Sequence, residues 1–337
     1  MGRIYQSAGL RALGGSYHAG RRGGSPASTA MTSDSTIVHL SDLHLSAPSP
    51  SFHPKRALAY LSWRLRRRSH FDREAFAALP EDIRGLNPSG AVITGDLTQL
   101  GLPSEYEQVA DWLPQLGDSS RISLVPGNHD VTRAEPPART LALWDQWIGP
   151  PGGPAGQQFP SVREIGDDLV LVGLSSARPS LPTLAVGTLG SAQLESLKEV
   201  LDVAGAAGRF RIVFLHHPPC EGDVGWRKRL TDAEQLRCVL NSHGTELVLH
   251  GHAHRPLFGS LVAAGRSVPV IGAPSASESN AVKGRRPRYN AYRIARVAAG
   301  WELDVSVRAW NARERAFEVD ETRRLSVSSP ENLRAAN

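Results

Sequence analysis

The sequence predicts an α/β fold, in which helices cover the faces of β-sheets. Short runs of Val, Ile and Leu recur from residue 36 onward, helical patterns separate several of them, and each run ends in a polar or glycine-containing loop. Uninterrupted apolar runs of this length are typical of strands that are buried on both faces. Strands that alternate with helices indicate sheets covered by helices.

The predicted elements follow one another in chain order. The apolar runs predict strands within residues 36–45, 90–101, 121–131, 168–176, 210–219 and 246–256. Helices are predicted at 104–116, 191–205 and 231–244. Ser104 and Glu107 have the spacing of a capping box at the start of the first helix. Residues 149–156, rich in Pro and Gly, predict a loop between two halves of one domain. Residues 289–310 alternate polar and apolar side chains around a turn at 298–300, which predicts a hairpin at a sheet edge.

A single domain is predicted over residues 34–320, with a basic helical insertion near 52–80 that contains the cluster Arg64–Arg68. That cluster suits either a solvated helix face or a cap that contacts phosphate. Residues 1–33 predict a disordered leader. This leader is either an organellar transit peptide or a stretch that precedes a true start at Met31. Residues 321–337 are polar and predict a loose tail.

Most of the net charge of +5 comes from the leader, whose first 30 residues hold four Arg and no acid. The rest of the chain has 34 Lys and Arg against 33 Asp and Glu, which does not favour a nucleic-acid partner. The chain has only two cysteines, which excludes a disulfide scaffold and a thiolate zinc site and fits a reducing, cytoplasmic setting. Every apolar run is shorter than the roughly 18 to 20 residues that span a bilayer. We therefore expect no membrane span.

Polar side chains follow the predicted strands at five places. The blocks are Asp42-Leu43-His44, Gly95-Asp96, Gly127-Asn128-His129-Asp130, His216-His217 and Gly251-His252-Ala253-His254. Ligands in open α/β sheets bind at the carboxyl ends of strands, so we expect the blocks to converge on one crevice. Imidazole and carboxylate ligands without thiolates suit Mn, Fe, Zn or Co.

Within the blocks, the spacing D-x-H or H-x-H would direct both side chains to the same side of an extended segment. Both could then reach one ion or an adjacent pair. The glycines before Asp96, Asn128 and His252 are expected to let the backbone turn tightly beneath the ligands.

In this order and form the five blocks resemble those of the calcineurin-like metallophosphoesterases, over about residues 36–275. The resemblance implies a four-layer α/β/β/α sandwich with two mixed β-sheets. It implies two metal ions, each Mn, Fe, Zn or Co. One would be held by Asp42, His44, Asp96 and His254, and the other by Asp96, Asn128, His216 and His252. His129 would stand beside the leaving-group oxygen with Asp130 orienting it. Asn128, His217 and Arg255 are candidates for substrate contact.

The chemistry that the resemblance implies is hydrolysis of a small phosphoester by a metal-bridging hydroxide, which two cations make available at neutral pH. The imidazole of His129 would supply the proton that the departing oxygen needs. The motif wording is most similar to bacterial cyclic-nucleotide phosphodiesterases, so a phosphodiester such as a cyclic nucleotide is the expected substrate. Leu97-Thr98-Gln99 lacks the Asp-Arg-Gly continuation of Ser/Thr protein phosphatases, and Gln99 replaces the tyrosine ligand of purple acid phosphatases.

The alternatives are a nucleotide-sugar or lipid pyrophosphatase, a nuclease, or a catalytically silent scaffold of the same fold. Every matched position keeps its expected residue, which disfavours the scaffold. The sequence makes no prediction of the oligomeric state.

Overall fold

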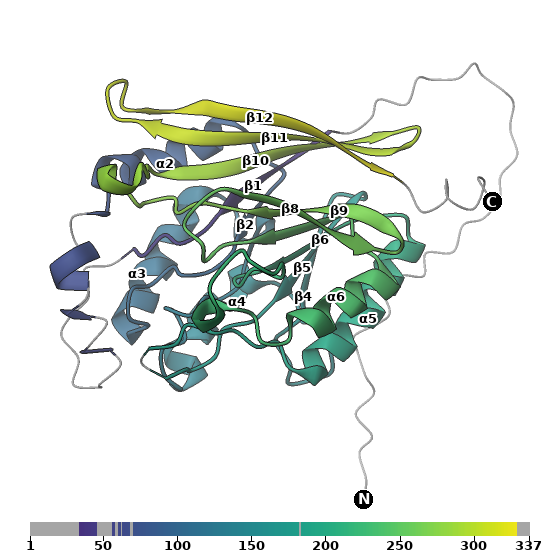
Figure 1. Ribbon diagram of the computed structural model, residues 1–337, viewed down its shortest axis with the longest axis horizontal. Coiled ribbons are helices and arrows are strands. Elements are labelled where there is room, and N and C mark those ends of the chain that lie inside the picture. Colours follow the sequence, from purple (N-terminus) through teal and green to yellow (C-terminus); the bar gives the residue numbers. More distant parts are fainter. Residues whose placement is uncertain are drawn as a thin grey trace, which may run out of the picture. The chain divides into compact units, whose positions relative to one another are not determined.

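Two six-stranded sheets lie face to face between two layers of helices in the computed structural model of this chain (Figure 1). The structure describes residues 34–45, 56–57, 60–61, 63–67, 70–181 and 183–328. Both sheets are mixed, because each combines parallel and antiparallel pairs of neighbouring strands. The four-layer arrangement predicted from the family resemblance is confirmed.

The first sheet has the strand order β12-β11-β10-β1-β2-β3. Its strands are β1 Ser35–Leu40, β2 Gly90–Ile93, β3 Ile122–Leu124, β10 Arg288–Val297, β11 Gly300–Asn311 and β12 Ala316–Ser328. The strands β1, β2 and β3 are parallel, whereas β10 is antiparallel to β1. The predicted hairpin is present as β10 and β11, but β12 lies between it and the edge of the sheet.

Strand β12 also corrects the prediction of a loose tail over residues 321–337, because the strand continues to Ser328 and pairs with β11 along its length. An edge strand needs few apolar side chains, and only Phe317 and Val327 of β12 are buried. Its polar composition was therefore misleading. Residues 329–337 and the predicted leader, 1–33, lie outside the described residues.

The second sheet has the strand order β4-β5-β6-β7-β9-β8. Its strands are β4 Ser161–Ile165, β5 Leu169–Leu174, β6 Phe210–Leu215, β7 Leu247–His250, β8 Leu257–Ala263 and β9 Arg266–Gly272. The strands β5, β6, β7 and β9 are parallel. The chain passes from β3 of the first sheet to β4 of the second through residues 149–156, the loop that was predicted between the two halves.

Helices pack on the outer face of each sheet (Figure 1). The α-helices are α2 Arg73–Gly85, α3 Pro103–Trp112, α4 Asp145–Ile148, α5 Ser191–Ala206 and α6 Ala233–His243. Apolar side chains of α2 and α3 pack against β1, β2 and β3, and those of α5 and α6 pack against β5, β6 and β7. A third buried cluster, which includes Ile37, Val92, Phe214 and Leu249, fills the space between the sheets.

Short helical turns lie between these elements. They are the 3₁₀ segments Leu113–Leu116, Ser119–Arg121, Pro137–Arg139, Leu141–Trp144, Trp226–Lys228 and Ala281–Lys283, and a π-helical turn, Trp63–Arg67. The described part of the predicted insertion, 52–80, thus contains the π-helical turn and the beginning of α2. None of the helices in the described ranges is long and apolar enough to cross a membrane.

The start of α3 differs from the predicted capping box. The helix begins at Pro103, so Ser104 lies within the helix and does not cap it. Proline is favoured at the first helical position, because its φ is already helical and its missing N–H would have had no partner there. The carboxylate of Glu105 accepts hydrogen bonds from the backbone N–H groups of Leu100 (3.0 Å) and Leu102 (2.8 Å).

Candidate metal centre

The loops that follow the parallel strands bring the predicted ligands together. Asp42 and His44 follow β1, Asp96 follows β2, His216 follows β6, and His252 and His254 follow β7. These side chains form two groups, whose nitrogen and carboxylate oxygen atoms lie within 4.8 Å of one another. The groups are Asp42, His44, Asp96 and His254, which we call the first donor set, and Asp96, His216 and His252, the second donor set. Asp96 belongs to both.

The backbone reaches this arrangement through left-handed conformations. Asp42, His44, Asp96, His252 and His254 have φ values of 53°, 46°, 55°, 70° and 53°. The blocks are therefore not extended, and the predicted two-residue strand repeat is the wrong reason for their convergence. Such φ values are uncommon outside glycine and cost of order 1–3 kcal/mol each. Hydrogen bonds between the loops hold them, among them the N–H of Asp42 to the carbonyl of Gly95 and that of His44 to the carbonyl of Asp96, both 3.0 Å.

Two glycines are required by close contacts, as predicted. A Cβ atom on Gly127 would lie 2.2 Å from Oδ1 of Asp96, and one on Gly251 would lie 1.8 Å from Oγ of Ser41. Both distances are far below a van der Waals contact. These glycines allow the loops to pass directly beneath the ligand side chains.

In the first donor set, hydrogen bonds determine which histidine nitrogen faces the centre. Nδ1 of His44 donates to the carbonyl of Thr98 (3.1 Å), and its buried Nε2 has no hydrogen-bond partner among the described residues. Nδ1 of His254 donates to Oε2 of Glu278 (2.7 Å), which directs Nε2 to within 3.0 Å of Oδ1 of Asp42. That carboxylate oxygen also lacks a well-aligned donor in the described part of the chain.

Around the second donor set, three potential ligand atoms lie within 3.4 Å of Nε2 of His216, one of them from the neighbouring Asn128. Nδ1 of His216 donates to the carbonyl of Thr94 (2.6 Å). Nε2 of His216 then lies 3.1 Å from Nδ1 of His252, 3.2 Å from Oδ1 of Asn128 and 3.4 Å from Oδ2 of Asp96. Since these are mostly acceptor atoms, they can lie this close only if a proton or a cation is shared between them.

The electrostatics keep the carboxylates ionised. Burial alone would raise the pKa of Asp96, but the nearby His216 and His129 lower it well below its ordinary range. Burial lowers the pKa of His216 and His254, yet Asp96 and Asp42 respectively outweigh it and raise both to about 9. Burial lowers the pKa of His44 to about 3. Buried carboxylates held beside imidazoles are a suitable donor set for a divalent cation, which would replace the shared protons.

A family model described as calcineurin-like phosphoesterase matches residues 35–256, more than half of the chain. The chain belongs to the calcineurin-like phosphoesterase family. The chain is similar to a probable cyclic nucleotide phosphodiesterase of Rhodococcus erythropolis, with 28% identity over 222 residues, which cover 65% of this chain and 64% of the relative. It is also similar to a cAMP/cGMP dual specificity phosphodiesterase of Mycobacterium tuberculosis, with 29% identity over 54% of this chain and 57% of the relative. The matches therefore span less than two thirds of either relative.

Among solved structures, a dimetal phosphatase from Danio rerio has a similar fold. The TM-score is 0.61 at 15% sequence identity, and the match covers 87% of this chain and 99% of that one. At this identity the similarity supports the calcineurin-like phosphoesterase fold alone.

The predicted roles of His129 and Asp130 in this calcineurin-like phosphoesterase differ in their support. His129 lies beside the first donor set, with its ring 4.8 Å from that of His44. Its Nδ1 is 2.6 Å from the carbonyl of Gln99, and this backbone group, instead of Asp130, orients the ring. The carboxylate of Asp130 accepts from the backbone N–H groups of Gly127 (2.8 Å) and Thr98 (2.8 Å), so it fixes the loop.

His217 and Arg255 were predicted to contact substrate. His217 is fully buried, and both ring nitrogens are occupied, by Oγ of Ser176 (2.8 Å) and the carbonyl of Ala185 (3.1 Å). It therefore has no free nitrogen for a substrate, and its ring packs 4.6 Å from that of His252. Arg255 is exposed and donates to the carbonyl of Asp223 (2.9 Å), so a substrate contact stays a prediction for it.

Sequence reasoning missed the groups that orient the histidines. Glu278 lies 24 residues after His254 in a Ser-rich segment without a strand-end motif, so no local signal marks it. The carbonyls of Thr94, Thr98 and Gln99 act through the backbone, which a sequence pattern cannot reveal. Their position directly after β2 is the only available hint, since loops at strand ends line such sites.

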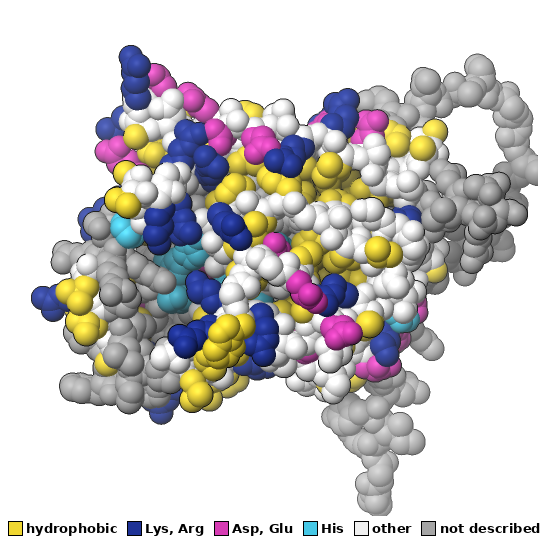
Figure 2. Space-filling model, in the orientation of Figure 1, with side chains coloured by type: hydrophobic (Ala, Val, Ile, Leu, Met, Phe, Trp, Pro, Cys, Tyr) yellow, Lys and Arg dark blue, Asp and Glu magenta, His cyan; other side chains and the backbone are white. Residues whose placement is uncertain are grey.

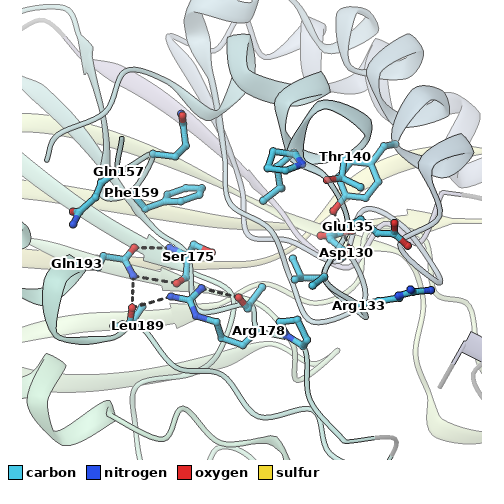
Figure 3. A pocket seen from close by; sticks show the side chains of 18 of the residues that line it. Asp130, Arg133, Glu135, Thr140, Gln157, Phe159, Ser175, Arg178, Leu189 and Gln193 are labelled. Atoms are coloured by element: carbon cyan, nitrogen blue, oxygen red, sulfur yellow. Dashed lines mark hydrogen bonds between the residues drawn. The ribbon is translucent and has the colours of Figure 1, made fainter. Parts of the chain in front are cut away.

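The described residues around the centre line two cavities, among others. One, of about 500 Å³, is lined by Asp130, Arg178 and Gln193 (Figure 3). Its wall is fixed, because Gln193 bonds the backbone of Ser175 and Leu189, and Arg178 donates to the carbonyls of Ala177 and Leu189. The other, of about 430 Å³, adjoins His254. On the face shown in Figure 2, histidine side chains lie among Lys and Arg side chains.

Proposed function

We propose that this chain is a dinuclear metal-dependent phosphoric ester hydrolase that acts on small phosphodiesters in the cytoplasm, with 3′,5′-cyclic nucleotides as the first candidates. The observation that carries the proposal is the pair of donor sets that share Asp96. The names of the relatives support the choice of phosphodiesters, and the calcineurin-like family supports ester hydrolysis.

The side chains present fit two cations of Mn, Fe, Zn or Co. Asp42, His44, Asp96 and His254 would hold one, and Asp96, Asn128, His216 and His252 the other. A cation would be bound by Nε2 of His44, which has no hydrogen-bond partner among the described residues, and by Oδ1 of Asp42, beside Nε2 of His254. When bound, two cations supply the charge that polarises a phosphoryl group and makes a water molecule acidic enough to attack it at neutral pH.

The chain's own residues then have distinct tasks. The side-chain amide of Asn128 lies beside the second donor set, with its oxygen 3.2 Å from Nε2 of His216. Its NH₂ group would donate a hydrogen bond to the phosphoryl oxygens. Nδ1 of His129 donates to the carbonyl of Gln99, and Nε2 is the atom to which we assign the proton that passes to the departing ester oxygen. The N–H of His129 also donates to Oδ1 of Asp96 (2.7 Å), so the proton donor and the shared ligand are positioned by one hydrogen bond.

Among the alternative functions inferred from the sequence, the geometry of the two donor sets disfavours the catalytically silent scaffold. A silent scaffold would need no complete donor sets, and the described residues contain every ligand that the resemblance implies. A pyrophosphatase or a nuclease would use the same centre and would differ in the groups around it.

The test is the turnover of a chromogenic phosphodiester, bis(p-nitrophenyl) phosphate, beside the matching monoester, by the full chain in the presence of Mn²⁺. We expect a strong preference for the diester, which Asp96→Asn abolishes. A preference for the monoester would replace the proposal with a phosphatase. If neither ester were hydrolysed with any of the four metals, the hydrolase assignment would have to be abandoned.

A further inference from the structure

The cavity of about 430 Å³ beside His254 is unusual in its charge. Five cationic side chains line it, against the single carboxylate of Glu278. The cations are Arg255, Lys283, Arg285, Arg286 and Arg288. We call this cavity the basic pocket. Its volume lies in the range of pockets that bind small molecules.

The ion pairs of the basic pocket leave positive charge unmatched. Arg285 pairs with Glu278 (3.0 Å), whose carboxylate also accepts from Nδ1 of His254. Arg286 and Arg288 share one carboxylate, that of Asp320 outside the pocket. Two arginines on one acid cannot both be neutralised.

Two further groups in the wall lack a partner. The exposed ammonium group of Lys283 makes no ion pair within the described ranges. Arg288 carries a buried Nε–H without a hydrogen-bond acceptor in the part of the chain that the structure describes. Donors without an acceptor are unfavourable when they are buried, so these two groups add to the excess of donors over acceptors around the pocket.

The basic pocket and the candidate metal centre share one side chain, the imidazole of His254. Nε2 of His254 lies 3.0 Å from Oδ1 of Asp42 in the first donor set, and Nδ1 of the same ring lies 2.7 Å from Glu278 in the pocket wall. The pocket therefore adjoins the first donor set, at a distance of one imidazole ring.

We propose that the basic pocket binds a second anionic group of the substrate, a phosphate or similar oxyanion carried by the molecule whose phosphoester is hydrolysed at the metal centre. This inference rests on the proposed function and narrows its substrate class to phosphodiesters that carry a second phosphate, in place of 3′,5′-cyclic nucleotides, which carry only one. Guanidinium and ammonium groups are the side chains that recognise phosphate oxygens. In the sequence these groups form the stretch KGRRPR, residues 283–288.

A matched pair of chromogenic substrates tests the proposal. Thymidine 5′-(p-nitrophenyl phosphate) and its 3′-phosphorylated derivative have the same nucleoside and the same leaving group, and differ only in the second phosphate. We expect the derivative to have a KM about tenfold lower with the full chain, since one or two charge-assisted hydrogen bonds are worth roughly that factor. The double variant Lys283→Gln, Arg286→Gln should lose the difference. Lys198→Gln is the matched control, because Lys198 lies on helix α5 and does not line the pocket. This variant should keep the difference in KM between the two esters.

A second measurement does not depend on turnover. Calorimetry of the metal-free full chain with inorganic phosphate should show binding that is about tenfold weaker in the double variant and unchanged in Lys198→Gln. Equal KM values for the two esters in the wild type would overturn the proposal, as would a difference that survives in the double variant. Phosphate binding without a KM difference would also overturn it, because the pocket would then take a free anion. If neither ester is hydrolysed, the proposed function fails, and calorimetry alone decides whether the pocket binds phosphate.

Discussion

Replacing Glu278 should weaken metal binding although this residue belongs to neither donor set. Its Oε2 accepts from Nδ1 of His254 at 2.7 Å, and its side chain is 14% exposed, so the contact is largely shielded from water. A hydrogen bond to a charged group contributes about 1.5–3 kcal/mol. At about 1.4 kcal/mol for each factor of ten, Glu278→Ala should reduce the affinity of the first donor set roughly 10- to 100-fold.

The assay is a calorimetric or chelator-competition titration of the metal-free protein with Mn²⁺ or Zn²⁺. Glu278→Gln retains an oxygen that can accept from His254 and should lose less affinity than Glu278→Ala. Glu221→Ala is the control, because Glu221 is exposed in its pair with Arg237 and lies outside the donor sets. An affinity in Glu278→Ala within twofold of the wild type would refute the reasoning that this carboxylate orients His254.

Three further predictions concern the shared ligand, the proton donor and the core. Asp96→Asn should lower the metal bound per chain and reduce turnover together, as measured by elemental analysis beside the diester assay, and full metal content would contradict a shared role. His129→Ala should slow esters with poor leaving groups by about 10²–10⁴, with little effect on p-nitrophenyl esters and none on metal content, whereas equal losses for both esters would contradict proton donation. Glu246→Gln should destabilise the fold by about 3–5 kcal/mol in chemical denaturation, because it leaves Arg211 buried without its partner at 2.8 Å. Burial alone would raise the pKa of Glu246, but Arg211 outweighs it and lowers this pKa. The stabilisation by Glu246 should therefore be present above the ordinary carboxyl range and be lost as the pH falls through the lowered pKa. A difference in stability between the wild type and Glu246→Gln that does not change with pH would count against the Arg211–Glu246 ion pair.

The parts of the fold that were predictable are those in which burial dictates composition. Strands β5, β6 and β7 lie inside the sandwich and have side chains buried along their whole length, so their sequences are almost purely apolar. Strand β12 lies at an edge and has mostly exposed side chains, so its sequence resembles that of a loop. The helix α3 was predicted, but its first residue was not, because Pro103 takes the first helical position and Glu105 accepts from the N–H of Leu102 before it.

The ligands of the candidate centre were predictable because each follows a buried strand directly. Their partners were not, because Glu278 is distant in sequence and the carbonyls of Thr94 and Gln99 belong to the backbone. The same limit explains the misassigned role of Asp130. Adjacency to His129 suggested a contact, but the local backbone directs this carboxylate to the N–H groups of a neighbouring loop.

Each donor set takes its side chains from both sheets of the sandwich. Asp42, His44 and Asp96 follow strands of the first sheet and meet His254 from the second, and Asp96 also meets His216 from the second sheet. Bound cations would therefore act as cross-links between the two sheets, in addition to hydrogen bonds such as the one from His216 to the carbonyl of Thr94. Ligands that bind only the folded state stabilise it by mass action. The concentration of available metal would then determine how stably the two sheets are held together, as well as whether the centre is active.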